Sequence, residues 1–156
     1  MTDDTRWAVA ILAAGKGTRM KSERPKVLHE LAGRPLIDHV VELALGIARP
    51  HDVVVVVGHG ASAVGLRVRD LGVSDVLQEP QLGTGDALRV ALEGLGDCPA
   101  DRLLVLSGDV PLLRPATLRR LMAAVGDEVC AALLTAELKD PGPYGRIDRD
   151  EHGRVR

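Results

Sequence analysis

Residues 7–19 read Trp7-Ala8-Val9-Ala10-Ile11-Leu12-Ala13-Ala14-Gly15-Lys16-Gly17-Thr18-Arg19. The first eight residues form a short apolar run, as expected of a strand buried in a sheet, and a glycine-rich loop follows at once. Its two glycines allow a tight turn that presents backbone N–H groups to an anion, and Lys16 and Arg19 add positive charge. An ordinary turn can have the same composition, so the loop alone leaves phosphate binding and a plain turn both open.

Apolar strand patterns alternate with helical ones along the rest of the chain. Five consecutive valines at 53–57 favour a central strand buried on both faces. The patterns predict strands at 7–14, 53–57, 75–78, 103–106 and 129–138, helices at 35–48, 60–70, 84–95 and 115–125, and the beginning of a hairpin at 146–156. This alternation predicts an α/β fold: one domain with a Rossmann-like, mostly parallel sheet and helices on both faces.

Composition excludes several classes of function. Lys and Arg number 20 against 22 Asp and Glu, and the only aromatic residues are Trp7 and Tyr144, so nucleic-acid binding is not expected. The acidic N-terminus and the lack of an apolar run of about 20 residues predict a cytoplasmic chain with no membrane partner. Cys98 and Cys130 stand apart, which favours two buried, reduced thiols over a zinc site. No serine lies in a GxSxG motif, which argues against a serine hydrolase.

The loops after three predicted strands converge on one place. Ligands of such sheets bind at the carboxyl ends of the strands, so residues 15–19, 78–84 and 107–109 are expected to share one crevice. In residues 78–85, glutamine offers both a donor and an acceptor to a pyrimidine edge, and Gly83 allows close backbone approach. Thr84 is predicted to be the N-cap of a helix whose positive end faces the crevice. An N-cap with a polar loop would explain Thr84 without a ligand, but not two glutamines and two glycines in eight positions.

Two charged residues suit phosphate chemistry in the same crevice. Asp109 follows a strand in Ser107-Gly108-Asp109-Val110-Pro111, where its carboxylate suits Mg²⁺ that also binds substrate phosphates. The alternative is an aspartate in a turn before proline. Lys26 follows Pro25 and suits the charge of a leaving pyrophosphate, although an isolated lysine is often only a solvated surface residue.

Together these segments resemble the bacterial N-acetylglucosamine-1-phosphate uridylyltransferases of the GlmU type, in their nucleotidyltransferase domain. The resemblance runs over essentially the whole chain. Its first motif is common to sugar nucleotidyltransferases in general, and the later motifs narrow the resemblance to these uridylyltransferases. The motifs that carry it are residues 12–20, 25–29, 31–33, 81–85, 108–112, 140–141 and 144–147.

The resemblance implies a nucleotide-diphospho-sugar transferase fold and a specific reaction. N-acetylglucosamine-1-phosphate would attack the α-phosphorus of UTP in line, giving UDP-N-acetylglucosamine, a cell-wall precursor, and pyrophosphate. Arg19 and Lys26 would hold the triphosphate, and Asp109 would bind Mg²⁺. The residues implied to contact nucleotide or sugar are Leu12, Ala13, Ala14, Gly15, Lys26, Gln78, Gln81, Gly83, Thr84, Ser107, Gly108 and Gly145.

The chain departs from the resembling family in three ways. Asp86 stands where histidine is usual, so the first helical turn gains a charge that favours the helix dipole but repels phosphate. Ser107 stands where tyrosine is common. The family's second metal ligand, its sugar-binding glutamate and asparagine, and its acetyltransferase β-helix domain would all lie beyond Arg156. A C-terminally incomplete domain of this kind is expected to bind nucleotide weakly, turn over slowly or not at all, and associate into homo-oligomers through an uncovered sheet edge.

Two other interpretations remain open from sequence. A sugar nucleotidyltransferase with another base or acceptor would keep the fold, although residues 81–85 and 144–147 argue against it. A non-catalytic fragment that binds uridine nucleotide would retain the crevice but lack the downstream ligands. A pyrophosphate-release assay with UTP separates the fragment from the enzyme.

Overall fold

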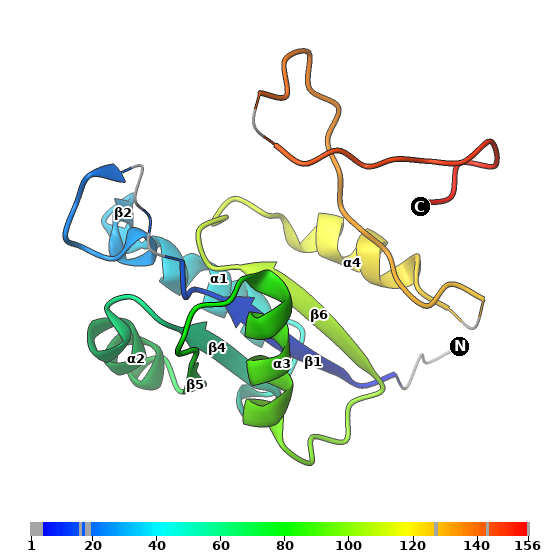
Figure 1. The fold of residues 1–156 in the computed structure, drawn as a ribbon. Coiled ribbons are helices and arrows are strands. Elements are labelled where there is room, and N and C mark those ends of the chain that lie inside the picture. Colours follow the sequence, from blue (N-terminus) through cyan, green and yellow to red (C-terminus); the bar gives the residue numbers. More distant parts are fainter. Residues whose placement is uncertain (1–4, 16, 18–19, 127, 143, 156) are drawn as a thin grey trace. The chain divides into compact units, whose positions relative to one another are not determined.

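A four-stranded parallel sheet organises the first of two units in the computed structural model, which describes residues 5–15, 17, 20–126, 128–142 and 144–155. The first unit ends at Thr117, and the second begins at Leu118. The strands lie in the order β5 (Ser74–Leu77), β4 (Val53–Val57), β1 (Trp7–Leu12) and β6 (Arg102–Ser107) (Figure 1). The register pairs Val9 with Val53 on one side and with Leu104 on the other. This arrangement confirms the predicted α/β fold with a mainly parallel sheet.

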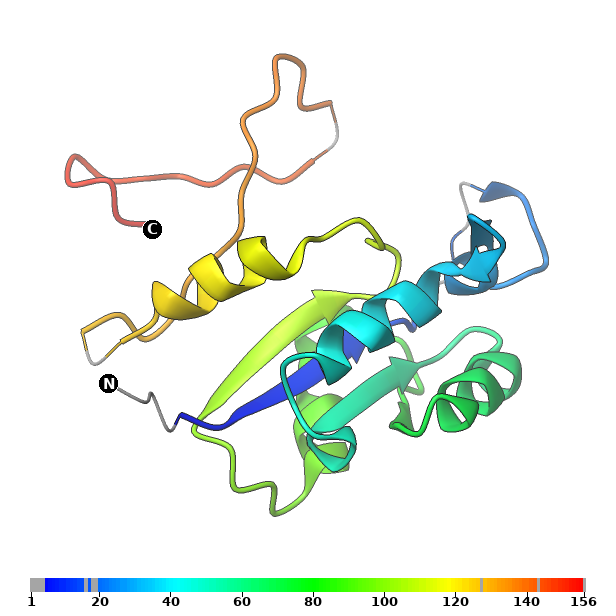
Figure 2. The ribbon, with the colours of Figure 1, turned by 180° about the vertical axis from the view of Figure 1, so that it is seen from behind.

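The order of the strands reverses beside β1. The chain runs outward from β1 to β4 and β5 and then crosses back over the sheet to β6 on the other side of β1. Helices α1 (Leu36–Leu45) and α2 (Ala61–Asp70) therefore cover one face, and α3 (Thr84–Leu95) covers the other (Figures 1 and 2). The order reverses between β1 and β6, and open α/β sheets hold their ligands at the carboxyl ends of the strands at such a point.

The core follows from the two-residue period of the strands. All five valines of β4 are buried, because helices cover the sheet on both faces. On one face Ala10, Val54 and Val56 pack against Ala87, Val90 and Ala91 of α3. The side chains at alternate positions of the strands point to the opposite face, under α1 and α2.

Short elements fill the connection between β1 and α1 and the approach to β4. Among the described residues they include the 3-10 helices Lys26–Leu28 and Pro50–Asp52 and the antiparallel pair of β2 (Glu30–Leu31) and β3 (Arg34–Pro35). None of the helices among the described residues is long and apolar enough to cross a lipid bilayer.

The predicted N-cap at Thr84 is wrong by one residue. Thr84 is the first residue of α3, and Gly83 is the N-cap, with φ 107° and ψ −175°. Glycine adopts these angles readily, whereas a threonine side chain would be strained there. No side chain caps the first turn of α3, so the backbone conformation of Gly83 ends the loop.

The second unit holds most of α4 (Pro115–Ala123) and the segment that follows it. The predicted strand at 129–138 is wrong, because these described residues form neither helix nor strand. A strand needs a partner for its N–H and C=O groups, and apolar composition alone does not supply one. Cys130 is exposed and Cys98 only partly buried, which corrects the prediction of two buried thiols. Arg149 and Val155 form an antiparallel bridge within the predicted hairpin.

Candidate functional site

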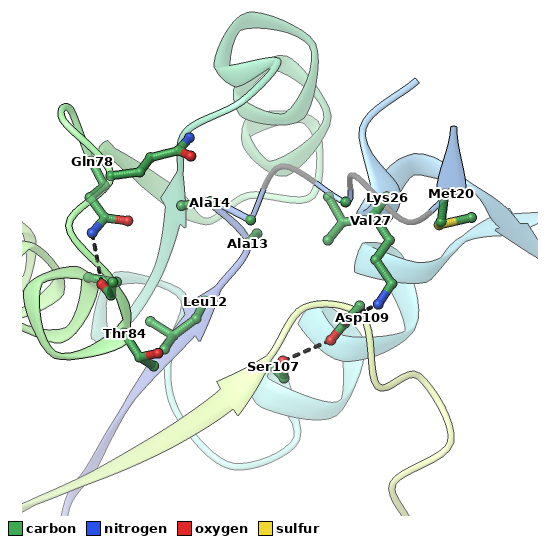
Figure 3. A pocket seen from close by; sticks show the side chains of 15 residues that line it. Leu12, Ala13, Ala14, Met20, Lys26, Val27, Gln78, Thr84, Ser107 and Asp109 are labelled. Carbon is green, nitrogen blue, oxygen red and sulfur yellow. Dashed lines mark hydrogen bonds and ion pairs between the residues drawn. The ribbon is translucent and has the colours of Figure 1, made fainter. Parts of the chain in front are cut away.

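A cavity of about 550 Å³ opens at the carboxyl ends of the strands, where the strand order reverses. This volume lies within the range of small-molecule sites. The loop after β1, the 3-10 helix that begins at Lys26, the segment from β5 into α3 and the end of β6 all contribute to its wall (Figure 3). Of the predicted site residues, those that line the cavity are Leu12, Ala13, Ala14, Gly15, Lys26, Gln78, Gln81, Gly83, Thr84, Ser107 and Asp109.

Two described residues of the prediction, Gly108 and Gly145, are not among those that line the cavity, and a third predicted residue, Arg19, lies outside the described residues. Gly108 is buried behind the wall, where its N–H donates to the carbonyl of Leu12 at 2.9 Å, and a Cβ there would lie 3.1 Å from that of Ala13. Gly108 therefore lets the ends of β1 and β6 pack closely. Gly145 belongs to the second unit, so its contact with the sugar stays a prediction.

Small side chains form the cavity wall after β1. Ala13 and Ala14 are buried, and the Ala13 N–H donates to the carbonyl of Val56 at 2.9 Å, which continues the pairing of β1 with β4 beyond the strand. A Cβ at Gly58 would lie 2.9 Å from both the Cβ and the carbonyl oxygen of Ala14. The loops after β1 and β4 are thus packed with no room for larger residues at this point.

Lys26, Asp109 and Ser107 form a connected charged group on the wall. Nζ of Lys26 lies 2.5 Å from Oδ2 of Asp109, and the Ser107 hydroxyl donates to Oδ1 at 2.8 Å (Figure 3). Partial burial raises the pKa of Asp109, but the hydrogen bonds from Lys26 and Ser107 outweigh it and hold this pKa below its ordinary value. Asp109 is therefore an anion at neutral pH.

Gln78 and Asp86 form a second polar group beside the cavity. Gln78 is buried, and its Nε2 donates to the Gly83 carbonyl at 3.0 Å and to Oδ2 of Asp86 at 2.8 Å. Arg89 donates to Oδ1 of Asp86 at 2.9 Å. The hydrogen bond from Gln78, then that from Arg89, lowers the pKa of Asp86. The negative charge of Asp86 was expected to repel phosphate, but it is paired with Arg89 and accepts a hydrogen bond from Gln78.

Sequence reasoning missed several parts of this site. Gly17, Met20, Val27 and Ala87 also line the cavity. Ala87 lies on the buried face of α3, and the helical period could have placed it there. No local pattern signals the bond between Gln78 and Asp86, because it depends on how the loop of residues 78–83 closes.

The donors available to a metal ion are few. Among the described residues, no three or more His, Cys, Asp or Glu side chains gather into a group that could hold a metal. Of the described residues that line the cavity, Asp109 alone carries a carboxylate. A metal ion here would need most of its ligands from substrate and water.

A sequence profile described as the MobA-like NTP transferase domain matches residues 9–145. The chain belongs to this family of nucleotidyltransferases. The matched range contains every described residue that lines the cavity. Nucleotidyltransferases of this family work with a divalent metal ion.

Curated relatives of this nucleotidyltransferase are much longer than it is. The chain is 52% identical over 149 residues to the bifunctional protein GlmU of Chromohalobacter salexigens, which covers 94% of this chain and 31% of that protein. It is 46% identical over 155 residues to GlmU of Koribacter versatilis, covering 99% of this chain and 33% of that protein. The chain thus spans about a third of the length of these relatives.

Solved structures share the fold of this nucleotidyltransferase. A nucleotidyl transferase from a Methanothermobacter species matches with a TM-score of 0.62 and 29% identity, covering 76% of this chain and 57% of that one. A CMP:2-keto-3-deoxy-manno-octonic acid synthetase, solved in complex with CTP, matches with a TM-score of 0.59 and 26% identity, covering 77% of this chain and 47% of that one. Both matches confirm the nucleotide-diphospho-sugar transferase type of fold.

Proposed function

We propose that this nucleotidyltransferase transfers a uridylyl group from UTP to N-acetylglucosamine-1-phosphate, giving UDP-N-acetylglucosamine and pyrophosphate. The observation that carries the proposal is a single cavity that combines Gln78 with the pair of Lys26 and Asp109. Identity of 52% to a GlmU protein supports the assignment, and the activity of the longer proteins is part of the proposal because the chain spans a third of them. The product would serve cell-wall synthesis in the cytoplasm.

The nucleobase end of the cavity is the part that contains Gln78, Gln81 and Gly83. Gly83 carries no side chain, so a flat base can approach its backbone. Thr84 begins α3 and lines the same end of the cavity. Leu12 to Gly15 would then lie along the nucleoside, and Gly145 of the second unit would contact the amino sugar.

The phosphate end of the cavity contains Lys26 and Asp109. Lys26 would stabilise the charge on the phosphates during in-line attack, and Arg19, outside the described residues, is proposed to assist it. Such transfer needs little covalent participation by the protein, since positioning and charge neutralisation lower most of the barrier. The observed group of one lysine, one serine and one carboxylate suits that kind of catalysis.

Asp109 is proposed to hold Mg²⁺. Mg²⁺ is commonly bound by one or two carboxylates together with substrate phosphates and water, and Asp109 supplies one ionised carboxylate on the cavity wall. When bound, a divalent ion would neutralise part of the negative charge on the phosphates. Lys26 and Ser107 each donate to one carboxylate oxygen of Asp109 and so hold this side chain in place on the cavity wall.

The second candidate function is that of a nucleotidyltransferase that uses another base. The similar synthetase solved with CTP favours cytidine as that base. The test is pyrophosphate release with Mg²⁺ and N-acetylglucosamine-1-phosphate, with UTP, CTP, GTP and ATP compared in parallel. UTP is expected to be the preferred nucleotide and to raise the melting temperature most. Equal shifts for all four nucleotides would contradict the uridine assignment, and selective binding of UTP without release of pyrophosphate would favour the non-catalytic alternative.

A further inference from the structure

The side-chain amide of Gln78 has only one possible orientation. Its terminal nitrogen lies 3.0 Å from the Gly83 carbonyl oxygen and 2.8 Å from Oδ2 of Asp86. Both partners can only accept hydrogen bonds, so the group between them must be the NH₂ and not the carbonyl. The amide is planar, and its Oε1 therefore points away from Gly83 and toward the interior of the cavity (Figure 3). No described residue donates a hydrogen bond to this oxygen.

Asp86 is itself fixed in place. It lies in the first turn of α3, and two nitrogens of Arg89 donate to its Oδ1, at 2.9 and 3.2 Å, which leaves Oδ2 for Gln78. Arg89 also donates to Glu93 one turn further on, at 2.5 Å. The bonds from Gln78 and Arg89 lower the pKa of Asp86, so it remains an acceptor throughout the neutral range. A histidine at this position could present either a donor or an acceptor, whereas an ionised aspartate can only accept.

We infer that Asp86 is a specificity-determining residue: by holding the NH₂ of Gln78, it leaves an acceptor facing the nucleobase and so selects bases that carry a ring N–H. This inference rests on the proposed function, because it assumes that the base binds beside Gln78. Uracil presents a donor, N3–H, to Oε1 of Gln78. Cytosine presents an unprotonated N3, which would place two acceptors against each other at a buried position.

Selection by Asp86 and Gln78 is needed because the fold does not choose the base. The similar synthetase was solved with CTP in the same type of fold, at 26% identity. A buried polar group that loses its partner disfavours the wrong ligand more strongly than a small change of shape does. The polarity of one amide can therefore separate UTP from CTP in a cavity of the same size.

The test compares affinities for UTP and CTP, measured by calorimetry with Mg²⁺, in the wild-type chain, Asp86→Ala and Glu93→Ala. Both substitutions remove a carboxylate that accepts from Arg89, but only Asp86 contacts Gln78. We expect the wild type to prefer UTP about tenfold or more. Asp86→Ala should lower that ratio about fivefold or more, since only the Gly83 carbonyl then holds the NH₂ of Gln78 and the amide can turn more readily. Glu93→Ala should leave the ratio unchanged.

The outcomes separate this inference from the proposed function. Failure of the wild type to bind UTP at all contradicts the proposed function, whereas UTP binding with an unchanged ratio in Asp86→Ala overturns the inference alone. Thermal unfolding shows whether each variant folds. If Asp86→Ala does not fold, the inference is tested instead on the wild-type chain, by measuring its affinity for N3-methyluridine triphosphate and for CTP, which both lack the ring N–H. Both should bind about tenfold or more weaker than UTP, and affinities equal to that of UTP would overturn the inference.

Discussion

Lys26 and Asp109 stand 83 positions apart in the sequence, yet Nζ of Lys26 lies 2.5 Å from Oδ2 of Asp109 on the wall of the cavity. The pair joins the segment that follows β1 to the loop that follows β6, across the point where the strand order reverses. Neither side chain is needed to fill the core, because both are partly exposed. Their contact is therefore best tested through ligand binding and not through stability.

Asp109→Asn should abolish most of the Mg²⁺-dependent part of UTP binding while the chain stays folded. The amide keeps the shape of the side chain but removes the charge that a divalent ion needs. We expect UTP affinity with Mg²⁺ to fall about tenfold or more, with little change when EDTA replaces Mg²⁺. Asp97→Asn makes the same chemical change at an exposed position and is the control. If Asp109→Asn instead unfolds the chain and leaves metal-dependent binding unchanged, Asp109 stabilises a turn and does not bind the metal ion.

Lys26→Ala should lower pyrophosphate release much more than it lowers stability. The ion pair with Asp109 is partly exposed, and pairs of this kind contribute only about 0–1 kcal/mol to the free energy of unfolding. Loss of charge beside the phosphates should instead slow turnover about a hundredfold, as removal of one transition-state donor does in other enzymes. Lys139→Ala removes an exposed lysine of the second unit and should change neither quantity. Equal turnover by Lys26→Ala and wild type would make Lys26 a surface residue only.

The sheet could be predicted from the sequence because its strands are buried on both faces. The strand predicted at 53–57 has the same bounds as β4. The strand predicted at 103–106 is one residue shorter at each end than β6. The shared crevice was predictable as well, since strand ends of a parallel sheet meet at one edge. The strand predicted at 129–138 was wrong because an apolar run shows that a segment can pair, but not that a partner exists.

The contacts within the site depend on geometry that no local pattern contains. Gln78 was predicted to face a base, but its bond to Asp86 requires the positive φ of Gly83 and the closing of the loop between them. Asp86 was predicted from its charge alone to repel phosphate, without the partner that engages it. Sequence therefore indicated which residues meet, and the structure shows how their donors and acceptors are assigned.

Stability should fall in acid partly because of Asp52. This buried carboxylate accepts hydrogen bonds from Cys98 at 3.1 Å and from Arg49 at 3.2 Å. Burial raises the pKa of Asp52, but the Cys98 bond and the charges of His51 and Arg49 outweigh it and lower this pKa. The Asp52 carboxylate therefore binds a proton more tightly in the unfolded chain than in the folded one. The contribution of Asp52 is complete above the ordinary aspartate pKa of about 4 and is lost as pH falls through the lowered value.

Asp52→Asn measures that contribution directly. Urea unfolding at pH 7 should show the variant less stable by about 1–3 kcal/mol, since the partners lose a charged acceptor. The difference should shrink as both proteins are titrated from pH 5 toward pH 2, because the wild-type carboxylate then becomes neutral too. A difference that stays constant over this range would mean that packing, and not charge, makes Asp52 important.

Gly58→Ala should weaken both the fold and nucleotide binding. The added Cβ would lie 2.9 Å from the Cβ and the carbonyl oxygen of Ala14, so the cavity wall after β1 must shift. Overpacking of this kind costs about 1–3 kcal/mol. Gly85→Ala is the matched control for stability, because a Cβ there meets nothing within 4 Å and alanine favours α3 by about 0.5–1 kcal/mol. Urea unfolding should therefore move in opposite directions for the two variants, and UTP titration should show weaker binding by Gly58→Ala. If Gly58→Ala matches the wild type in both measurements, close packing of the loops after β1 and β4 does not shape the site.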